Sequence, residues 1–250
     1  MPIESKKGTS AAPASSGALG RDVRLPGEPG ASAYAALPAG AKRGVVVVHE
    51  IFGRQPEIDR VVERFAEGGY AALAPDLFGT TPKPLCVARA MIETNLGRGP
   101  MIATLQRARA WLGEAAGLPP RSVGLIGFCL GGSFALAAGP DWGAVSTNYG
   151  SLPPDGVMRG LPPVIGCYGA RDRVFGHTGR KLETRLHRLG VDAQAHTFAN
   201  AGHSFLTDGQ HPLAAALSRP FFHVHYDADT AEEAWRLIFA HFDRHLAPPP

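Results

Sequence analysis

The sequence has few cysteines and no long apolar run. Its only cysteines are Cys86, Cys129 and Cys167, none close to another in sequence. This odd, scattered set argues against a disulfide framework and against a CxxC zinc site, and it fits a reducing compartment. No stretch reaches the roughly 20 apolar residues of a transmembrane helix, and residues 1–20 lack the apolar core of a secretory signal. We therefore expect a cytoplasmic protein with no membrane partner.

Charge is equally sparse and is not concentrated. Only 19% of the residues are charged, the formal net charge is +3, and the basic residues are scattered rather than grouped. Such a pattern gives no support for nucleic-acid binding. His223 and His225 alternate on an expected strand, which is compatible with a metal, but no third ligand is evident. We expect no metal and no cofactor, and a monomer is compatible with the sequence.

The length of 250 residues and the hydrophobic content of 44% fit one large α/β domain. Residues 1–20 are rich in small and polar types, which bury too little apolar surface to offset the entropy of ordering. We expect residues 1–20 to be disordered and residues 21–250 to form a single domain.

Apolar periodicity predicts alternating strands and helices. An edge hairpin is expected over 23–37, and further strands are expected over 44–48, 70–74, 123–128, 164–168 and 193–198. Helices are expected around 58–65, 102–112, 133–138, 182–189 and 235–246. Residues 79–100 contain several prolines and glycines and are expected to form an insertion at the sheet's edge around a short helix. The alternation predicts an α/β fold, with a mostly parallel, doubly wound sheet that carries helices on both faces.

Cys129 lies in the most informative segment, Gly127-Phe128-Cys129-Leu130-Gly131-Gly132. An apolar strand precedes it and a helical pattern of small residues follows, which is the layout of a nucleophile elbow. At a helix N-terminus, the partial positive charge favours a thiolate. The alternative is a buried structural cysteine between a strand and a helix.

Asp172 and His203 follow the ends of later expected strands, so the chain order is nucleophile, acid, histidine. That is the order of an α/β-hydrolase triad, and reactive groups of such sheets gather at the carboxyl ends of the strands. A thiol needs a nearby imidazole to take its proton, and the imidazole needs a carboxylate to orient it. Taken separately, Asp172 could be a helix cap and His203 an ordinary histidine.

Five segments together resemble the dienelactone hydrolases, which are cysteine-using α/β-hydrolases. They are His49-Glu50-Ile51-Phe52-Gly53, Ala74-Pro75-Asp76-Leu77-Phe78, the elbow, Gly169-Ala170-Arg171-Asp172 and Ala201-Gly202-His203-Ser204-Phe205. The resemblance spans about residues 30–247. It implies a hydrolase for a small-molecule ester or lactone.

The resemblance also gives Glu50 a role, in which the matching glutamate contacts the resting thiol and helps to ionise it. The alternative for Glu50 is a solvent-facing loop residue. The backbone N–H groups of Leu130 and Ile51 are expected to form the oxyanion hole. Family members bind a substrate carboxylate through arginines, one of them shortly after the catalytic histidine. Residues 203–208 contain no arginine here, which leaves Arg89 and Arg98 as candidates for a different anion contact.

The sequence thus predicts a hydrolase that forms an acyl-enzyme on Cys129, with His203 as base, Asp172 as orienting carboxylate and Glu50 tuning the thiol. A thioesterase or acyltransferase on the same triad is an alternative. A non-catalytic protein with Cys129 as a redox-sensing thiol is a further one.

Overall fold

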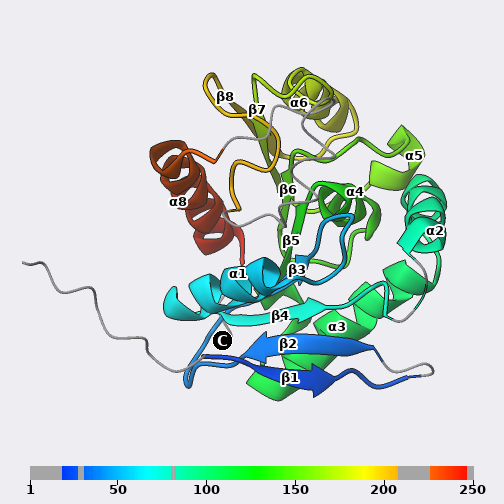
Figure 1. The fold of residues 1–250 in the computed structure, drawn as a ribbon. Helices are drawn as coiled ribbons and strands as arrows, with labels where there is room; N and C mark the ends of the chain where they lie inside the picture. Colours follow the sequence, from blue (N-terminus) through cyan, green and yellow to red (C-terminus); the bar gives the residue numbers. More distant parts are fainter. Residues whose placement is uncertain (1–18, 28–30, 80, 82, 208–225, 247–250) are drawn as a thin grey trace, which may run out of the picture.

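The computed structural model describes residues 19–27, 31–79, 81, 83–207 and 226–246, and its described strands form one sheet (Figure 1). The strand order is β1-β2-β4-β3-β5-β6-β7-β8. The strands are β1 (Arg21–Arg24), β2 (Ser32–Ala36), β3 (Gly44–Val48), β4 (Ala71–Pro75), β5 (Val123–Phe128), β6 (Val145–Asn148), β7 (Val164–Gly169) and β8 (Ala193–Phe198). β1 and β2 are antiparallel to their neighbours, and the strands from β4 to β8 are parallel.

The central strands are buried along their whole length because helices cover both faces of the sheet. Every residue of β3, the valine-rich strand, is buried, as is every residue of β4, β5 and β7. Continuous apolar strands of this kind are typical of parallel sheets packed on both sides.

Two residues of β5 show how the helices divide between the faces. A side chain at Gly124 would meet Phe242 of α8, whereas one at Gly127 would meet the backbone of α4. Because residues an odd number apart on a strand point to opposite faces, α8 and α4 lie on opposite sides of the sheet. Helix α1 packs with α8, and α3 and α6 share the side of α4. The helices are α1 (Pro56–Glu67), α2 (Lys83–Leu96), α3 (Pro100–Ala116), α4 (Leu130–Ala137), α5 (Asp155–Met158), α6 (Thr178–Arg188) and α8 (Ala228–His245), with a 3₁₀ turn over Pro120–Ser122.

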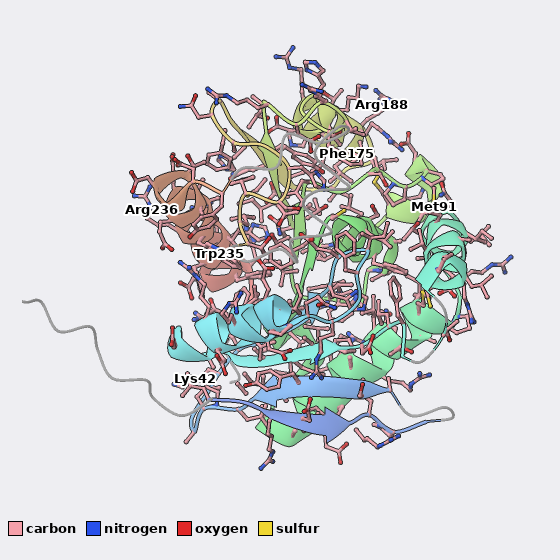
Figure 2. The ribbon with its side chains drawn as sticks, viewed as in Figure 1. Lys42, Met91, Phe175, Arg188, Trp235 and Arg236 are labelled. Carbon is pink, nitrogen blue, oxygen red and sulfur yellow. The ribbon has the colours of Figure 1, made fainter. Side chains whose placement is uncertain are left out.

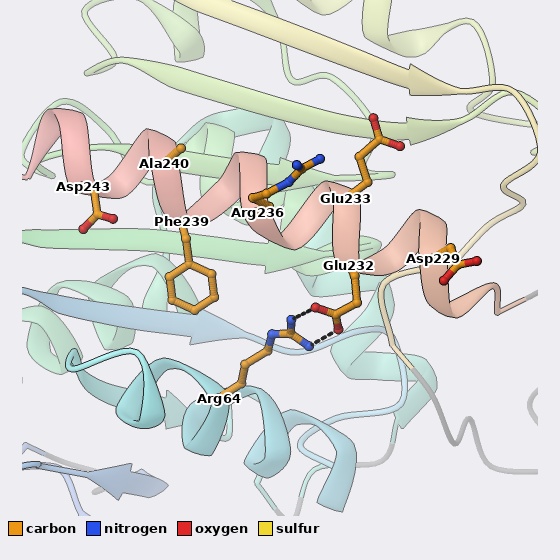
Figure 3. A pocket seen from close by; sticks show the side chains of 8 residues that line it. All are labelled: Arg64, Asp229, Glu232, Glu233, Arg236, Phe239, Ala240 and Asp243. Atoms are coloured by element: carbon orange, nitrogen blue, oxygen red, sulfur yellow. Dashed lines mark hydrogen bonds and ion pairs between the residues drawn. The ribbon is translucent and has the colours of Figure 1, made fainter.

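Aromatic packing and one ion pair hold α1 against α8. The ring of Phe65 lies 5.9 Å from that of Trp235 and 5.0 Å from that of Phe239. Arg64 donates two hydrogen bonds to the carboxylate of Glu232, at 2.8 and 2.6 Å (Figure 3). The core on this face is therefore closed by the C-terminal helix.

The structure confirms the fold class, including the edge hairpin as β1 and β2, and corrects two local expectations. Residues 79–100 do not form an insertion at the sheet's edge: they contain the 14-residue helix α2, which packs on α3 and α4. Figure 2 shows Met91 on the outer side of this helix, and its exposed fraction is 58%. Strand β6 was not predicted, because three of its four residues are polar.

Among the described residues, no helix is both long and apolar enough to cross a membrane. The expected disorder of residues 1–20 falls almost wholly outside the described part of the chain. It stays a prediction, as does the single domain over 21–250.

Candidate active site

Cys129 occupies a strained turn between β5 and α4. Its φ and ψ are 54° and −117°, a conformation that L-residues rarely adopt, and it is the N-cap of α4. The turn is possible because its neighbours lack side chains: a Cβ at Gly127 would overlap the carbonyl of Gly131. A Cβ at Gly131 would in turn overlap the carbonyl of Val48. The predicted elbow geometry is thus present, with the cysteine directly before a helix.

The imidazole of His203 links Cys129 to Asp172. Its Nδ1 lies 2.6 Å from Oδ2 of Asp172, and Cys129 is close enough for its charge to act on the ring. The exposed fractions of His203 and Asp172 are 4% and 3%, while Cys129 is half-buried. The other oxygen of Asp172 accepts hydrogen bonds from the backbone N–H groups of Val174 and Phe175, at 2.9 and 3.0 Å. The carboxylate therefore has a fixed orientation.

The electrostatics of this set favour a charged imidazole. Burial lowers the pKa of His203, but the charge of Cys129 and the hydrogen bond that the ring donates to Asp172 outweigh it and raise this pKa to about 10. Burial alone would raise the pKa of Asp172, but the hydrogen bond and charge of His203 hold it below its usual range. His203 thus lies between a cysteine and a fixed carboxylate, which is the arrangement that nucleophilic catalysis by a cysteine requires.

Glu50 lies in the same site, where it is held by hydroxyl groups. Ser204 Oγ donates to Glu50 Oε1 at 3.1 Å, and the hydroxyls of Tyr149 and Thr207 also help to lower the pKa of this carboxyl. Burial raises the pKa of Glu50, and the charge of His203 opposes that rise. Glu50 and His203 therefore interact through their charges, and no hydrogen bond joins Glu50 to Cys129 among the described residues.

Tyr149 and Ser204 are site residues that the sequence reasoning missed. Together with Cys129, they are the described non-glycine residues with positive φ, at 44° and 56°. The ring of Tyr149 lies 5.0 Å from that of His203. Backbone strain concentrated in this way is typical of functional sites. The signal available in the sequence was the segment Asn148-Tyr149-Gly150, which follows the unpredicted strand β6.

The expected oxyanion-hole donors lie on adjoining backbone segments. Leu130 is the first residue of α4, so its N–H has no partner within the helix. Neither this group nor the N–H of Ile51 donates a backbone hydrogen bond to another described residue. The two segments are in contact, since a Cβ at Gly131 would lie 2.6 Å from the carbonyl oxygen of His49. We therefore expect both donors to be available to an oxyanion formed at Cys129.

The remaining candidates lie apart from this set. Arg89 is paired with Glu93 on α2 at 2.8 Å, and Arg98 is exposed after that helix. His223 and His225 fall outside the described residues. Within the part that is described, no group of three or more His, Cys, Asp or Glu side chains is placed to hold a metal ion.

Comparison with known proteins gives a consistent result. The sequence pattern of the dienelactone hydrolase family matches residues 31–246. The carboxymethylenebutenolidase of Rhodococcus opacus is 28% identical over 246 residues, which cover 89% of this chain and 90% of that protein. A crystal structure of a dienelactone hydrolase-like promiscuous phosphotriesterase from metagenomic libraries superposes with a TM-score of 0.74 at 24% identity. That match covers 90% of this chain and 98% of the other.

Proposed function

Because this chain belongs to the dienelactone hydrolase family and is therefore an ester or lactone hydrolase, we propose that it works through an acyl-enzyme on Cys129. The observation that carries the proposal is the strained elbow that holds Cys129, with His203 beside it and hydrogen-bonded to Asp172 at 2.6 Å. A buried structural cysteine would need neither the imidazole nor the carboxylate. A redox-sensing thiol would not need them either.

In the first half-reaction, the thiolate of Cys129 attacks the carbonyl carbon of the ester or lactone. The resulting oxyanion accepts hydrogen bonds from the backbone N–H groups of Leu130 and Ile51. The carbon–oxygen bond to the leaving group then breaks, and the leaving alkoxide takes the proton from Nε2 of His203. A thioester on Cys129 and a neutral imidazole remain.

In the second half-reaction, His203 acts as the base. It takes a proton from a water molecule as the oxygen attacks the thioester carbon. The tetrahedral intermediate collapses to the carboxylic acid and the thiolate, which again pairs with the protonated imidazole. Asp172 keeps the ring in the required orientation throughout and stabilises its charge.

We assign Glu50 the role of tuning the Cys129–His203 pair. Its carboxylate favours a charged His203, because the two groups attract each other. Burial makes that charge costly to maintain, and the hydroxyl of Ser204 offsets part of this cost through its hydrogen bond. The protonation state of Glu50 would therefore set how readily the thiolate forms.

The substrate is proposed to be a small ester or lactone other than dienelactone itself. Residues 203–207 contain no arginine. The threonine of this segment, Thr207, cannot form the bidentate pair that an arginine makes with a carboxylate. We also propose that the protein is a single domain over 21–250 and is cytoplasmic. Its three cysteines are all free thiols, which supports a reducing compartment.

The test is hydrolysis of a panel of activated aryl esters and unsaturated lactones by the wild type, Cys129→Ala and Cys167→Ala. Cys167 is the control thiol, since it is fully buried in β7 and this burial raises the pKa of its thiol to about 12. We expect Cys129→Ala alone to lose turnover, and intact-mass spectrometry of the wild type with a slow ester to show an acyl adduct. Turnover by Cys129→Ala at the wild-type rate would refute the mechanism.

A further inference from the structure

Three arginines from three different elements line a cavity beside the antiparallel edge of the sheet. Arg24 ends β1, Arg89 belongs to α2 and Arg107 belongs to α3, and the cavity has a volume of about 550 Å³. Neither Cys129 nor His203 is among the residues that line it. Arginines brought together in this way repel one another unless an anion lies between them.

Two of these three charges have no carboxylate partner among the described residues. Arg89 donates to Glu93, which is buried and also accepts a backbone hydrogen bond from Met101 at 2.7 Å. Arg107, by contrast, donates to the neutral hydroxyl of Thr104, and its Nε is buried without a partner. Arg24 is exposed and forms no ion pair within the described part. The guanidinium groups of Arg24 and Arg107 therefore bring positive charge to the cavity that no ion pair of the described residues neutralises.

Asp76 also lines the cavity, but its carboxylate is already engaged. Its Oδ1 accepts hydrogen bonds from the backbone N–H groups of Phe78 and Gly79, at 3.0 and 3.2 Å, and lies 3.8 Å from Nε2 of His49. Among the described residues, no ion pair joins this carboxylate to Arg24 or to Arg107. It does not neutralise them by direct contact.

One aromatic contact joins the cavity lining to the segment that carries Glu50. Phe78 lines the cavity and packs edge-on against the ring of His49, at 4.8 Å between centroids. His49 precedes Glu50 and contacts its carbonyl through Nδ1 at 2.8 Å. The cavity thus borders the His49–Glu50 segment through Phe78, while Cys129, Asp172 and His203 do not line it.

We propose that this cavity binds a small organic anion carrying carboxylate or phosphate groups. Its volume suits a small molecule, and guanidinium groups bind both kinds of anion through charge-assisted, bidentate hydrogen bonds. Met101 and Phe78 supply an apolar surface for the rest of the ligand. This site is independent of the hydrolytic chemistry.

The experiment is calorimetric titration of the full chain with citrate and with inorganic phosphate, at an ionic strength held constant with chloride. We expect saturable binding of one of the two at millimolar concentration or below, and the stronger binder identifies the anion class. Arg24→Gln and Arg107→Gln should each weaken binding by about tenfold or more, since each removes a charge-assisted contact. Arg98→Gln is the matched control, because Arg98 is exposed and does not line the cavity.

Arg107 is hydrogen-bonded to Thr104, so Arg107→Gln could also disturb the fold. Arg24 is exposed, so Arg24→Gln tests binding without that effect. Cys129→Ala should leave binding unchanged, which separates this proposal from the proposed acyl-enzyme. No saturable binding of either anion would overturn the proposal. So would weakening by Arg98→Gln equal to that caused by Arg24→Gln.

Discussion

Replacing Cys129 by alanine should lower the pKa of His203 without disturbing the fold. Burial lowers this pKa, yet Cys129 and Asp172 together raise it from 6.5 to about 10. That net rise, 10 − 6.5, corresponds to about 5 kcal/mol in favour of the imidazolium. Cys129 makes the largest favourable contribution, and an opposite charge at close range shifts a pKa by about 1–3 units. We expect the pKa of His203 to fall by roughly that amount, so that the ring loses its proton at lower pH than in the wild type.

The assay is a pH titration of the imidazole resonances by NMR. The chain has ten histidines, and His203→Gln assigns the relevant signal by its disappearance. Cys167→Ala, with its thiol buried in β7, should leave the pKa of His203 unchanged. The same pKa in Cys129→Ala and the wild type would refute the idea that the thiolate holds the proton on His203.

Three further outcomes are expected. Asp172→Asn removes the charge that orients His203 and should lower kcat/KM for aryl esters by about 10²-fold or more, unless the carboxylate has no part in catalysis. Gly131→Ala should destabilise the fold by about 1–3 kcal/mol or more in urea unfolding, because its Cβ would press on the end of β3. Gly156→Ala should leave the stability unchanged, because no atom lies within 4 Å of the added Cβ. Equal losses of stability in the two variants would contradict the packing argument. Burial raises the pKa of Glu50, and below that pKa its side chain is neutral and resembles glutamine. The difference in kcat/KM between the wild type and Glu50→Gln should therefore grow as the pH rises and the carboxylate ionises. A difference that is constant with pH would count against the tuning role.

The elbow was predictable because its determinants are local. Cys129 stands between a strand pattern and a helix pattern, and the glycines at 127 and 131 are required by contacts within the same turn and with β3. Asp172 and His203 followed from the ends of strands that periodicity had already located. Their mutual geometry could only come from the folded sheet.

Strand β6 and helix α2 were harder to predict because tertiary contacts decide them. Thr147 and Asn148 are polar but buried, and their side chains donate to backbone carbonyls of α4 and β5, at 3.0 and 3.1 Å. No sequence pattern reveals those partners. In α2, the charged Glu93 is buried while Leu85 and Ile92 are exposed, at 65% and 60%, which obscures the amphipathic periodicity. Tyr149 was missed along with β6, since it follows that strand directly.

The three non-glycine residues with positive φ in the described part of the chain limit how this protein can be engineered. Each costs of order 1–3 kcal/mol of folding stability, which the surrounding packing must supply. Relaxing Cys129, Tyr149 or Ser204 to glycine would recover part of that stability but delete a group that contacts His203 or Glu50. Thermostability and activity are therefore in opposition at these positions. Substitutions intended to raise thermostability should therefore be made in the outer helices, with the elbow and its neighbours left unchanged.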